Sequence, residues 1–229
     1  MPDPTPHGCP TARELLLAAA RLTRLERAHL VVRLASAPWS RVVAAVEASR
    51  GPLLDVGCGP GLLAFLLGRR GFADAYLGVD PDPRKVERAR AWLGESASRS
   101  FRAARVEDAS EEGFDRAAIV DVLYLVPRQA RPALLSAVAE RLRPGGRVVV
   151  LTSGGGPRWK RLLDRLQERL ATLLGVTRGS VVDPCDGGEV AALLREAGFD
   201  DVRVEDVGAG YLHGFELVSA RNGRPRAEA

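Results

Sequence analysis

Three glycines stand at alternate positions, Gly57, Gly59 and Gly61, directly after one short apolar run and before a second. This pattern predicts a strand, a tight turn and the start of a helix. Glycine has no Cβ atom, so its backbone adopts positive φ readily and lets a ligand approach the main-chain N–H groups. These residues therefore predict a turn that holds a nucleotide-like cofactor.

An acidic residue follows this turn at a distance that suits the sugar of such a cofactor. Residues 75 to 79 read as a second strand that ends at Asp80, 23 residues beyond Gly57. An aspartate there accepts hydrogen bonds from both ribose hydroxyls of an adenosine, and it disfavours the 2′-phosphate of NADP. The alternative interpretation is that Asp80 only starts a turn with Pro81.

The spacing of the glycines distinguishes between cofactors. The dinucleotide fingerprint is G-x-G-x-x-G/A, whereas here the third glycine comes one position early and Leu62 takes the last place. Together with the preceding Leu54-Asp55-Val56, the pattern resembles motif I of class I S-adenosylmethionine (SAM) dependent methyltransferases. In that family the loop wraps the methionine part of SAM. A turn that is rich in glycine for steric reasons alone is the alternative.

Further segments match this family in order over about residues 30 to 220. Glu107 and Asp108 follow a predicted strand, where the family places a carboxylate on the adenine amino group. Asp121 to Tyr124 lie at the end of the next apolar strand, where its motif IV faces the transferable methyl group. The turn of residues 141 to 147 resembles the one that precedes the family's fifth strand.

The resemblance implies an α/β fold of the Rossmann-like methyltransferase type. Its seven-stranded sheet is mostly parallel with an antiparallel last strand, and helices cover both faces. The last strand should lie beside strand five. We expect strands at 53–57, 75–79, 101–106, 116–122, 147–151, 201–206 and 214–220, and helices at 61–70, 83–93, 128–142 and 187–197.

The resemblance also implies a set of site residues. The residues expected to bind SAM lie where strands end: Asp55, Gly57, Cys58, Gly59, Gly61, Asp80, Pro81, Glu107, Asp108 and Asp121. The candidate catalytic residues are Tyr124, Tyr211 and His213. His213 is the expected general base, because an imidazole titrates near neutral pH. A strand-end histidine bonded to backbone is the alternative.

Changes in composition divide the chain into segments. Leucines recur with a helical period over residues 11 to 34, and Ser36 to Trp39 should break that helical region. An extension of this kind covers the substrate cleft in many small-molecule methyltransferases, although plain core packing is the alternative. We expect an N-terminal helical extension at 1–50, a SAM-binding domain at 51–221, a lid-like insertion at 152–180 within it, and a disordered tail at 222–229.

Composition excludes several other functions. A chain of 229 residues with 46% hydrophobic content suits a single domain, and its 33 basic and 29 acidic residues are interspersed, which favours a solvated surface over a nucleic-acid site. The three cysteines and three histidines lie apart, so neither a disulfide framework nor a metal site is expected. No secretory signal or integral membrane segment is visible, and a cytoplasmic protein is expected.

The acceptor is less well defined than the cofactor. Amide-nitrogen and adenine-N6 methyltransferases carry a Pro-Pro pair after strand four, and this chain has Asp121-Val122-Leu123-Tyr124 instead. An oxygen or carbon acceptor on a small or lipid-like molecule is therefore expected. Segments 121–127, 157–160 and 210–213 also resemble bacterial methyltransferases of polyketide or aryl-polyene pathways, which implies an aromatic or acyl substrate, free or carrier-bound.

Three alternative functions share the fold. A SAM-binding regulatory module would keep the cofactor site without transferring a methyl group. An RNA methyltransferase should add an RNA-binding domain or an aromatic-lined basic groove, and only 5% of the residues are aromatic. An aminopropyltransferase should carry a carboxylate-rich polyamine pocket, which we do not identify in this sequence.

Overall fold

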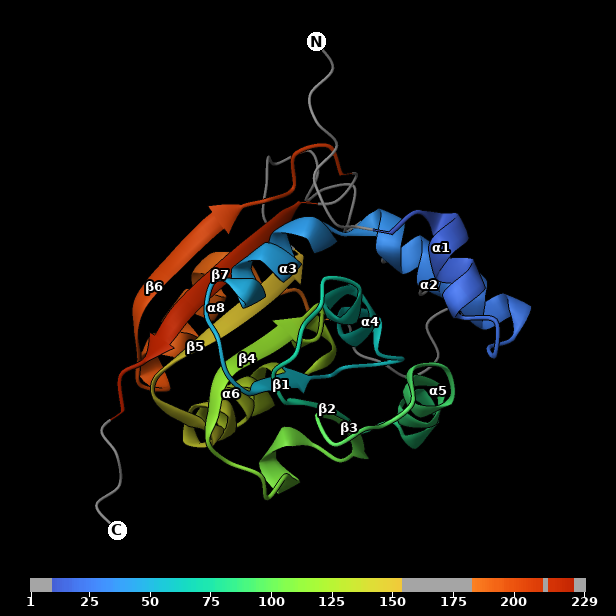
Figure 1. Ribbon diagram of the computed structural model, residues 1–229. Coiled ribbons are helices and arrows are strands. Elements are labelled where there is room, and N and C mark those ends of the chain that lie inside the picture. Colours follow the sequence, from blue (N-terminus) through green and yellow to red (C-terminus); the bar gives the residue numbers. More distant parts are fainter. Residues whose placement is uncertain (1–9, 154–182, 212–213, 225–229) are drawn as a thin grey trace.

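The computed structural model describes residues 10–153, 183–211 and 214–224. Within this part of the chain, seven strands form one sheet in the order β3-β2-β1-β4-β5-β7-β6 (Figure 1). The strands are β1 (Leu53–Val56), β2 (Tyr76–Asp80), β3 (Arg99–Ala103), β4 (Phe114–Val120), β5 (Leu142–Ser153), β6 (Phe199–Asp206) and β7 (Phe215–Asn222). Strands β1 to β5 are parallel, and β7 runs antiparallel to both β5 and β6. The expected insertion of the last strand beside strand five is confirmed.

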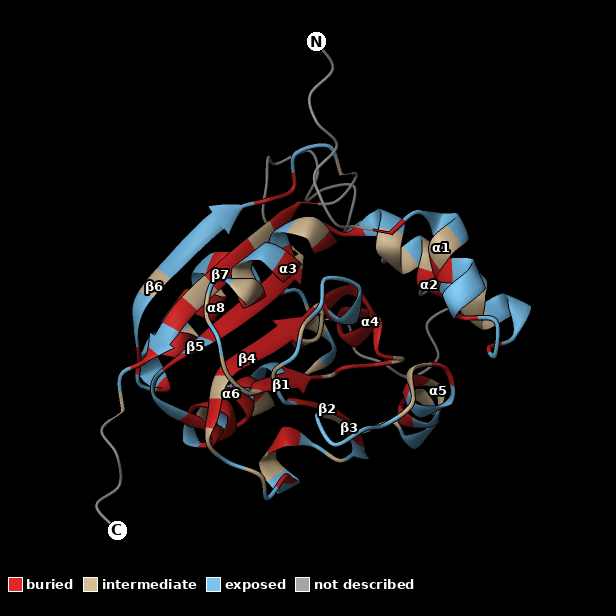
Figure 2. Ribbon diagram, viewed as in Figure 1, coloured by how far each residue is buried: buried red, intermediate tan, exposed pale blue. Residues whose placement is uncertain are grey.

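Helices cover both faces of the sheet because its central strands are apolar on both sides. Every residue of β1 and β2 is buried. Figure 2 shows the central strands mostly in red, the colour of buried residues. Along β4, Ala118 and Val120 join one core while Ala117 and Ile119 join the other, as the two-residue period of a strand requires. The first core contains α3 (Trp39–Glu47), α4 (Leu62–Arg69) and α5 (Pro83–Leu93), and the second contains α6 (Arg131–Arg141) and α8 (Gly187–Glu196).

The N-terminal region forms two helices, α1 (Ala12–Ala18) and α2 (Arg24–Ser36), where one helical stretch was expected. Each begins with a Thr-x-x-Glu capping box, in which the threonine side chain accepts from the backbone N–H of the glutamate and the glutamate accepts from that of the threonine. The second box restarts the helix at Thr23. The break expected at residues 36 to 39 is observed, since α2 ends at Ser36 and α3 begins at Trp39.

Two strands end at least two residues earlier than the sequence predicts. The third strand ends at Ala103, and residues 106 to 108 form the short 3-10 helix η1 (Val106–Asp108). The fourth strand ends at Val120 because Asp121 has φ +58°, which extended backbone does not allow. Both early ends place polar residues in turns at the carboxyl edge of the sheet.

The other boundaries differ by a few residues. The helix expected at 128–142 is a 3-10 turn, η3 (Arg128–Ala130), followed by α6, and β5 already begins at Leu142. Asn222, expected in a disordered tail, is the buried last residue of β7 and donates to the carbonyl oxygens of Ala139 and Leu142. Residues 154–180 of the expected insertion lie outside the described residues. No helix of the described ranges is long and apolar enough to cross a membrane.

Candidate functional site

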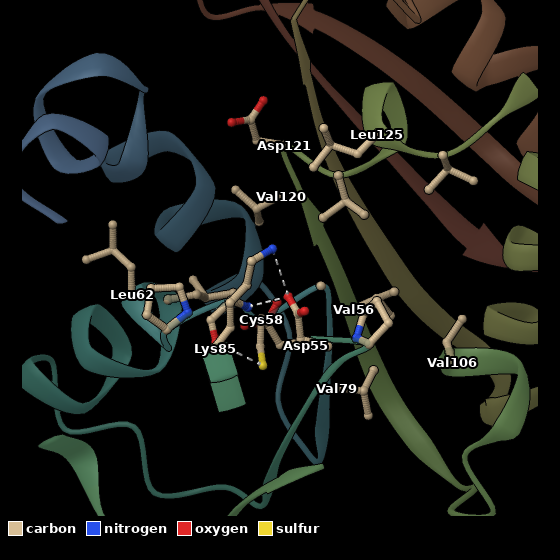
Figure 3. A pocket seen from close by; sticks show the side chains of 18 of the residues that line it. Asp55, Val56, Cys58, Leu62, Val79, Lys85, Val106, Val120, Asp121 and Leu125 are labelled. Atoms are coloured by element: carbon tan, nitrogen blue, oxygen red, sulfur yellow. Dashed lines mark hydrogen bonds and ion pairs between the residues drawn. The ribbon is translucent and has the colours of Figure 1, made fainter. Parts of the chain in front are cut away.

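A cavity of about 540 Å³ lies at the carboxyl ends of β1, β2 and β4 (Figure 3). Helix α2, the glycine turn, the ends of β2 and β4, and η1 all contribute to its wall. Its polar and charged lining residues are His29, Arg33, Asp55, Asp80, Lys85, Arg105, Glu107, Asp121 and Tyr124. Aliphatic residues and Trp39 form most of the remaining wall. Ligands of open α/β sheets bind at this edge, so the cavity is the candidate site.

The glycine turn is held against the end of β2 by its own main-chain N–H groups. Those of Gly57 and Cys58 donate to the carbonyl oxygen of Val79 at 2.7 and 3.0 Å, and that of Gly59 donates to Oδ2 of Asp80 at 3.0 Å. From the sequence, these N–H groups were expected to be open to a ligand. That expectation is wrong, because the fold uses them to fix the turn.

The three glycines of the turn have two roles: two of them line the cavity, and the third packs against α5. Gly57 and Gly59 line the cavity, and a Cβ atom on Gly59 would have only one atom within 4 Å, the carbonyl oxygen of Gly57 at 4.0 Å. Gly61 is not among the lining residues. A Cβ atom there would lie 2.6 Å from Cδ1 of Leu93 and 3.2 Å from Cβ of Ala89. The absence of a side chain at Gly61 therefore lets the turn pack against α5.

Asp80 orders the turn before α5, as one interpretation of the sequence expected, and it also faces the cavity, as the ribose-binding interpretation requires. It is buried at the end of β2 and lines the cavity, while its Oδ1 accepts the backbone N–H of Asp82 at 2.9 Å in the turn before α5. Nζ of Lys85 lies 3.9 Å from its Oδ2. Pro81, which follows Asp80, also lines the cavity. The carboxylate thus organises both adjoining turns and faces the cavity.

Asp55 and Tyr76 form a buried pair beneath the glycine turn. Asp55 is 2% exposed, and the Tyr76 hydroxyl donates to its Oδ2 at 2.5 Å. The pKa of Asp55 is raised to about 7, chiefly by burial; the hydrogen bond from Tyr76 opposes this rise, and the charge of Asp80 adds to it. Burial also raises the pKa of the adjacent Cys58 thiol well above its ordinary value. Cys58 is therefore a neutral thiol in the cavity wall.

Of the two carboxylates predicted at the adenine position, the structure brings one to the cavity. Glu107 lines it and is half-buried, whereas the neighbouring Asp108 is exposed and is not among the lining residues. Both lie in η1, whose tight turn directs consecutive side chains to different sides.

On the far side of the cavity, Asp121 and Tyr124, both expected in the site, lie with Arg33, for which no role was predicted. The Arg33 guanidinium, from α2, donates through Nη1 to Oδ2 of Asp121, 88 residues later. Asp121 is one of only two described non-glycine residues with positive φ, a conformation that an L-residue adopts at a cost. Burial and then the charge of Asp121 raise the pKa of Tyr124. In Figure 3, Asp121 and Leu125 lie at the opposite end of the view from Lys85.

Among the described residues, His29 is the histidine that lines the cavity. It lies one α2 turn before Arg33, and no role was predicted for it. Burial lowers its pKa, and the charges of Arg33, Arg88 and Lys85 lower it further, so the imidazole is neutral at pH 7. His213 lies outside the described residues. Tyr211 is not among the residues that line this cavity; its ring packs edge-on against Phe215, with centroids 5.8 Å apart. In the described part of the chain, no cluster of histidine, cysteine and carboxylate side chains could hold a metal ion.

Comparison with known proteins identifies the family. Residues 26–204 match the family model described as "Methyltransferase domain", and the chain belongs to this family. The ubiquinone biosynthesis O-methyltransferase of Xanthomonas axonopodis pv. citri (strain 306) is 32% identical over 175 residues, which cover 75% of this chain and 70% of that protein.

Two solved structures share the fold. Human N-acetylserotonin methyltransferase in complex with SAM superposes with a TM-score of 0.63 at 20% identity, covering 94% of this chain and 61% of that one. Magnesium protoporphyrin IX methyltransferase of Synechocystis PCC 6803 with bound SAH gives 0.60 at 18% identity, covering 80% of each chain. The protein is a SAM-dependent methyltransferase, and SAM is its cofactor.

Proposed function

We propose that this protein transfers the methyl group of SAM to an oxygen atom of a small molecule with a largely apolar body. One observation carries this proposal: a single cavity joins Asp80, at the end of β2, and Glu107, in η1, to the cluster of Arg33, Asp121 and Tyr124. The residues that we propose to bind SAM and a separate polar cluster therefore line the same cavity. The oxygen acceptor is supported by the relatives named as ubiquinone biosynthesis O-methyltransferases.

The described residues fit SAM, which is a cation overall. When bound, SAM supplies a methyl group that its sulfonium centre already activates. We assign Asp80 to the ribose hydroxyls and Glu107 to the adenine amino group, since both carboxylates face the cavity. Gly59 leaves open space for the amino-acid part, and the buried Asp55 supplies a carboxylate beside it. Cys58 and Pro81 form uncharged parts of the cavity wall.

The acceptor would lie between α2 and the end of β4. Trp39, Leu125 and Val122 provide apolar walls there, while Arg33 and Tyr124 provide polar groups. An apolar wall with a few polar groups favours an aromatic or acyl body with one reacting hydroxyl. Since a positive charge favours an oxyanion, the Arg33 guanidinium would promote ionisation of a phenolic or enolic hydroxyl.

Activation of that hydroxyl requires a group that accepts its proton. A neutral imidazole is available at His29, and we propose that this ring accepts the proton as the oxygen becomes nucleophilic. His213 remains the second candidate, as the sequence predicts. Holding the hydroxyl in line contributes more than the base does, because orientation alone can supply roughly 7 to 11 kcal/mol of the barrier.

The test is methyl transfer from SAM labelled at its methyl group. Purified protein would be incubated with a panel of phenols, enols, carboxylic acids, aromatic amines and a short RNA, and each product would be identified by mass. We expect a labelled ether from phenols or enols. The Asp80→Ala variant should lose the product, while the matched Asp82→Ala variant should keep it, because Asp82 is not among the lining residues.

Other outcomes would contradict the proposal in distinct ways. A labelled amine or RNA would indicate another acceptor class. Calorimetric binding of SAM without transfer to any acceptor, including those in a cell extract, would favour the regulatory module.

A further inference from the structure

Large apolar side chains are exposed on the two N-terminal helices. Of the six large hydrophobic residues exposed in the described ranges, four lie on α1 and α2. They are Leu16, Leu17, Leu25 and Val32, and the last three are 67%, 81% and 63% exposed. The two helices lie side by side at the periphery of the molecule, and much of their outer surface is exposed (Figures 1 and 2).

The exposed apolar residues of α2 form a continuous stripe along that helix. Leu25 and Val32 are seven residues apart and therefore lie on one face, and the exposed Ala28 and Ala35 continue it. The buried Leu30 lies on the opposite face and packs into the core. Helix α2 thus has two apolar faces, of which its own fold uses one.

Positive charge borders this stripe. Arg13, Arg21 and Arg24 are exposed and form no ion pair with any described residue. The two acidic residues of the same helices are already paired with arginines elsewhere, Glu14 with Arg69 at 2.7 Å and Glu26 with Arg88 at 2.5 Å. The free charge at the start of both helices is therefore positive.

We propose that this α1–α2 face, made of the exposed leucines, Ala28, Val32, Ala35 and the three arginines, binds an anionic phospholipid surface. Apolar side chains flanked by arginines complement the acyl boundary and the headgroups of such a surface together. A second copy of this chain is disfavoured as the occupant, because it would bring the same arginines against each other.

Binding in this way would place the methyl-transfer cavity beside the lipid. His29 and Arg33 of α2 line the cavity, and they adjoin Val32 and Ala28 of the stripe in the sequence. If the proposed function holds, an acceptor with a hydrophobic tail could pass from the lipid into the cavity along α2. The lipid contact itself does not depend on the acceptor.

Sedimentation with vesicles tests the contact. The full chain would be mixed with vesicles of phosphatidylglycerol and phosphatidylcholine in equal parts, and with vesicles of phosphatidylcholine alone. We expect binding to the first that weakens as salt rises. The L25E/V32E variant and the R21Q/R24Q variant should each bind at least tenfold more weakly. The V204E variant is the matched control, because Val204 is 45% exposed on β6 and lies outside this face.

Thermal unfolding of each variant would confirm that it is folded. Absence of binding to the anionic vesicles, equal binding to both vesicle types, or equal loss in V204E would each overturn the proposal. A wild-type dimer that L25E/V32E converts to a monomer, without vesicle binding, would identify a second copy as the occupant and overturn it too. Methyl transfer to a water-soluble acceptor should persist in L25E/V32E, which separates this proposal from the proposed function.

Discussion

The main-chain N–H of Gly59 donates a hydrogen bond of 3.0 Å to the carboxylate of Asp80, 21 residues further along the chain. Both residues were predicted to contact the same ligand, and they also hold each other. The turn is therefore positioned by the carboxylate before any ligand arrives, which reduces the ordering that binding must achieve. A ribose at Asp80 would share that carboxylate with the turn.

Replacing Asp80 tests this double role. We expect Asp80→Ala to weaken SAM binding at least tenfold by calorimetry, because a hydrogen bond to a charged group contributes roughly 1.5 to 3 kcal/mol and the turn loses its anchor. The control is Asp82→Ala, which removes the side-chain cap on the N–H of Arg84. That variant should lose about 1 kcal/mol of stability and keep its SAM affinity. Unchanged affinity in Asp80→Ala would refute the ribose role.

The raised pKa of Asp55 predicts a pH-dependent stability. Between the unfolded value of 3.8 and the folded value of about 7, the native state keeps a proton that the unfolded state has lost. Stability from this group therefore falls as pH rises through that window and levels off above it. Asp55→Asn, which still accepts from Tyr76, should stabilise the apo protein at pH 8 by on the order of 2 to 4 kcal/mol, and far less at pH 4.

Urea unfolding at several pH values measures this difference. An equal effect of Asp55→Asn at pH 4 and pH 8 would show that the carboxyl does not titrate as proposed.

The glycine turn predicts different costs at two of its positions. Both Gly59 and Gly61 have positive φ, so alanine at either position is strained by roughly 1 to 2 kcal/mol. Gly61→Ala also brings its Cβ atom against Leu93 and Ala89. The Cβ atom of Gly59→Ala instead enters the open space that we assign to the amino-acid part of SAM. We expect the larger loss of unfolding free energy for Gly61→Ala and the larger loss of SAM affinity for Gly59→Ala. The reverse order in either measurement would contradict this division.

The base is tested by the pH dependence of the rate. Because burial, and then the charges of nearby basic residues, lower the pKa of His29 from its usual 6.5, the rate with a phenolic acceptor should rise with pH below that value and then level off. His29→Gln should flatten this rise and slow a weakly acidic phenol by about 10²-fold or more, with less effect on a phenol that is already ionised. His213→Gln, measured in parallel, distinguishes the two histidines. An unchanged profile in His29→Gln would remove it as the base.

Much of the candidate cofactor site could be predicted because its parts are local. The glycine turn and Asp80 belong to one strand-turn-helix-strand unit, in which the positions of the backbone follow from spacing and apolar pattern. The succession of strands and helices along the chain, and the place of the last strand beside strand five, followed from alternation and from the resemblance of the whole pattern to one family.

What the tertiary structure decided concerns residues far apart, or neighbours whose exposure differs. Arg33 meets Asp121 across 88 residues only because α2 folds over the sheet edge, and no local pattern encodes that approach. Glu107 and Asp108 are chemically alike, and only the turn of η1 decides that Glu107 faces the cavity and Asp108 faces solvent. No local pattern indicates a partner for the N–H groups of the glycine turn. In the fold they donate to Val79 and Asp80, because a folded backbone must satisfy its own donors first.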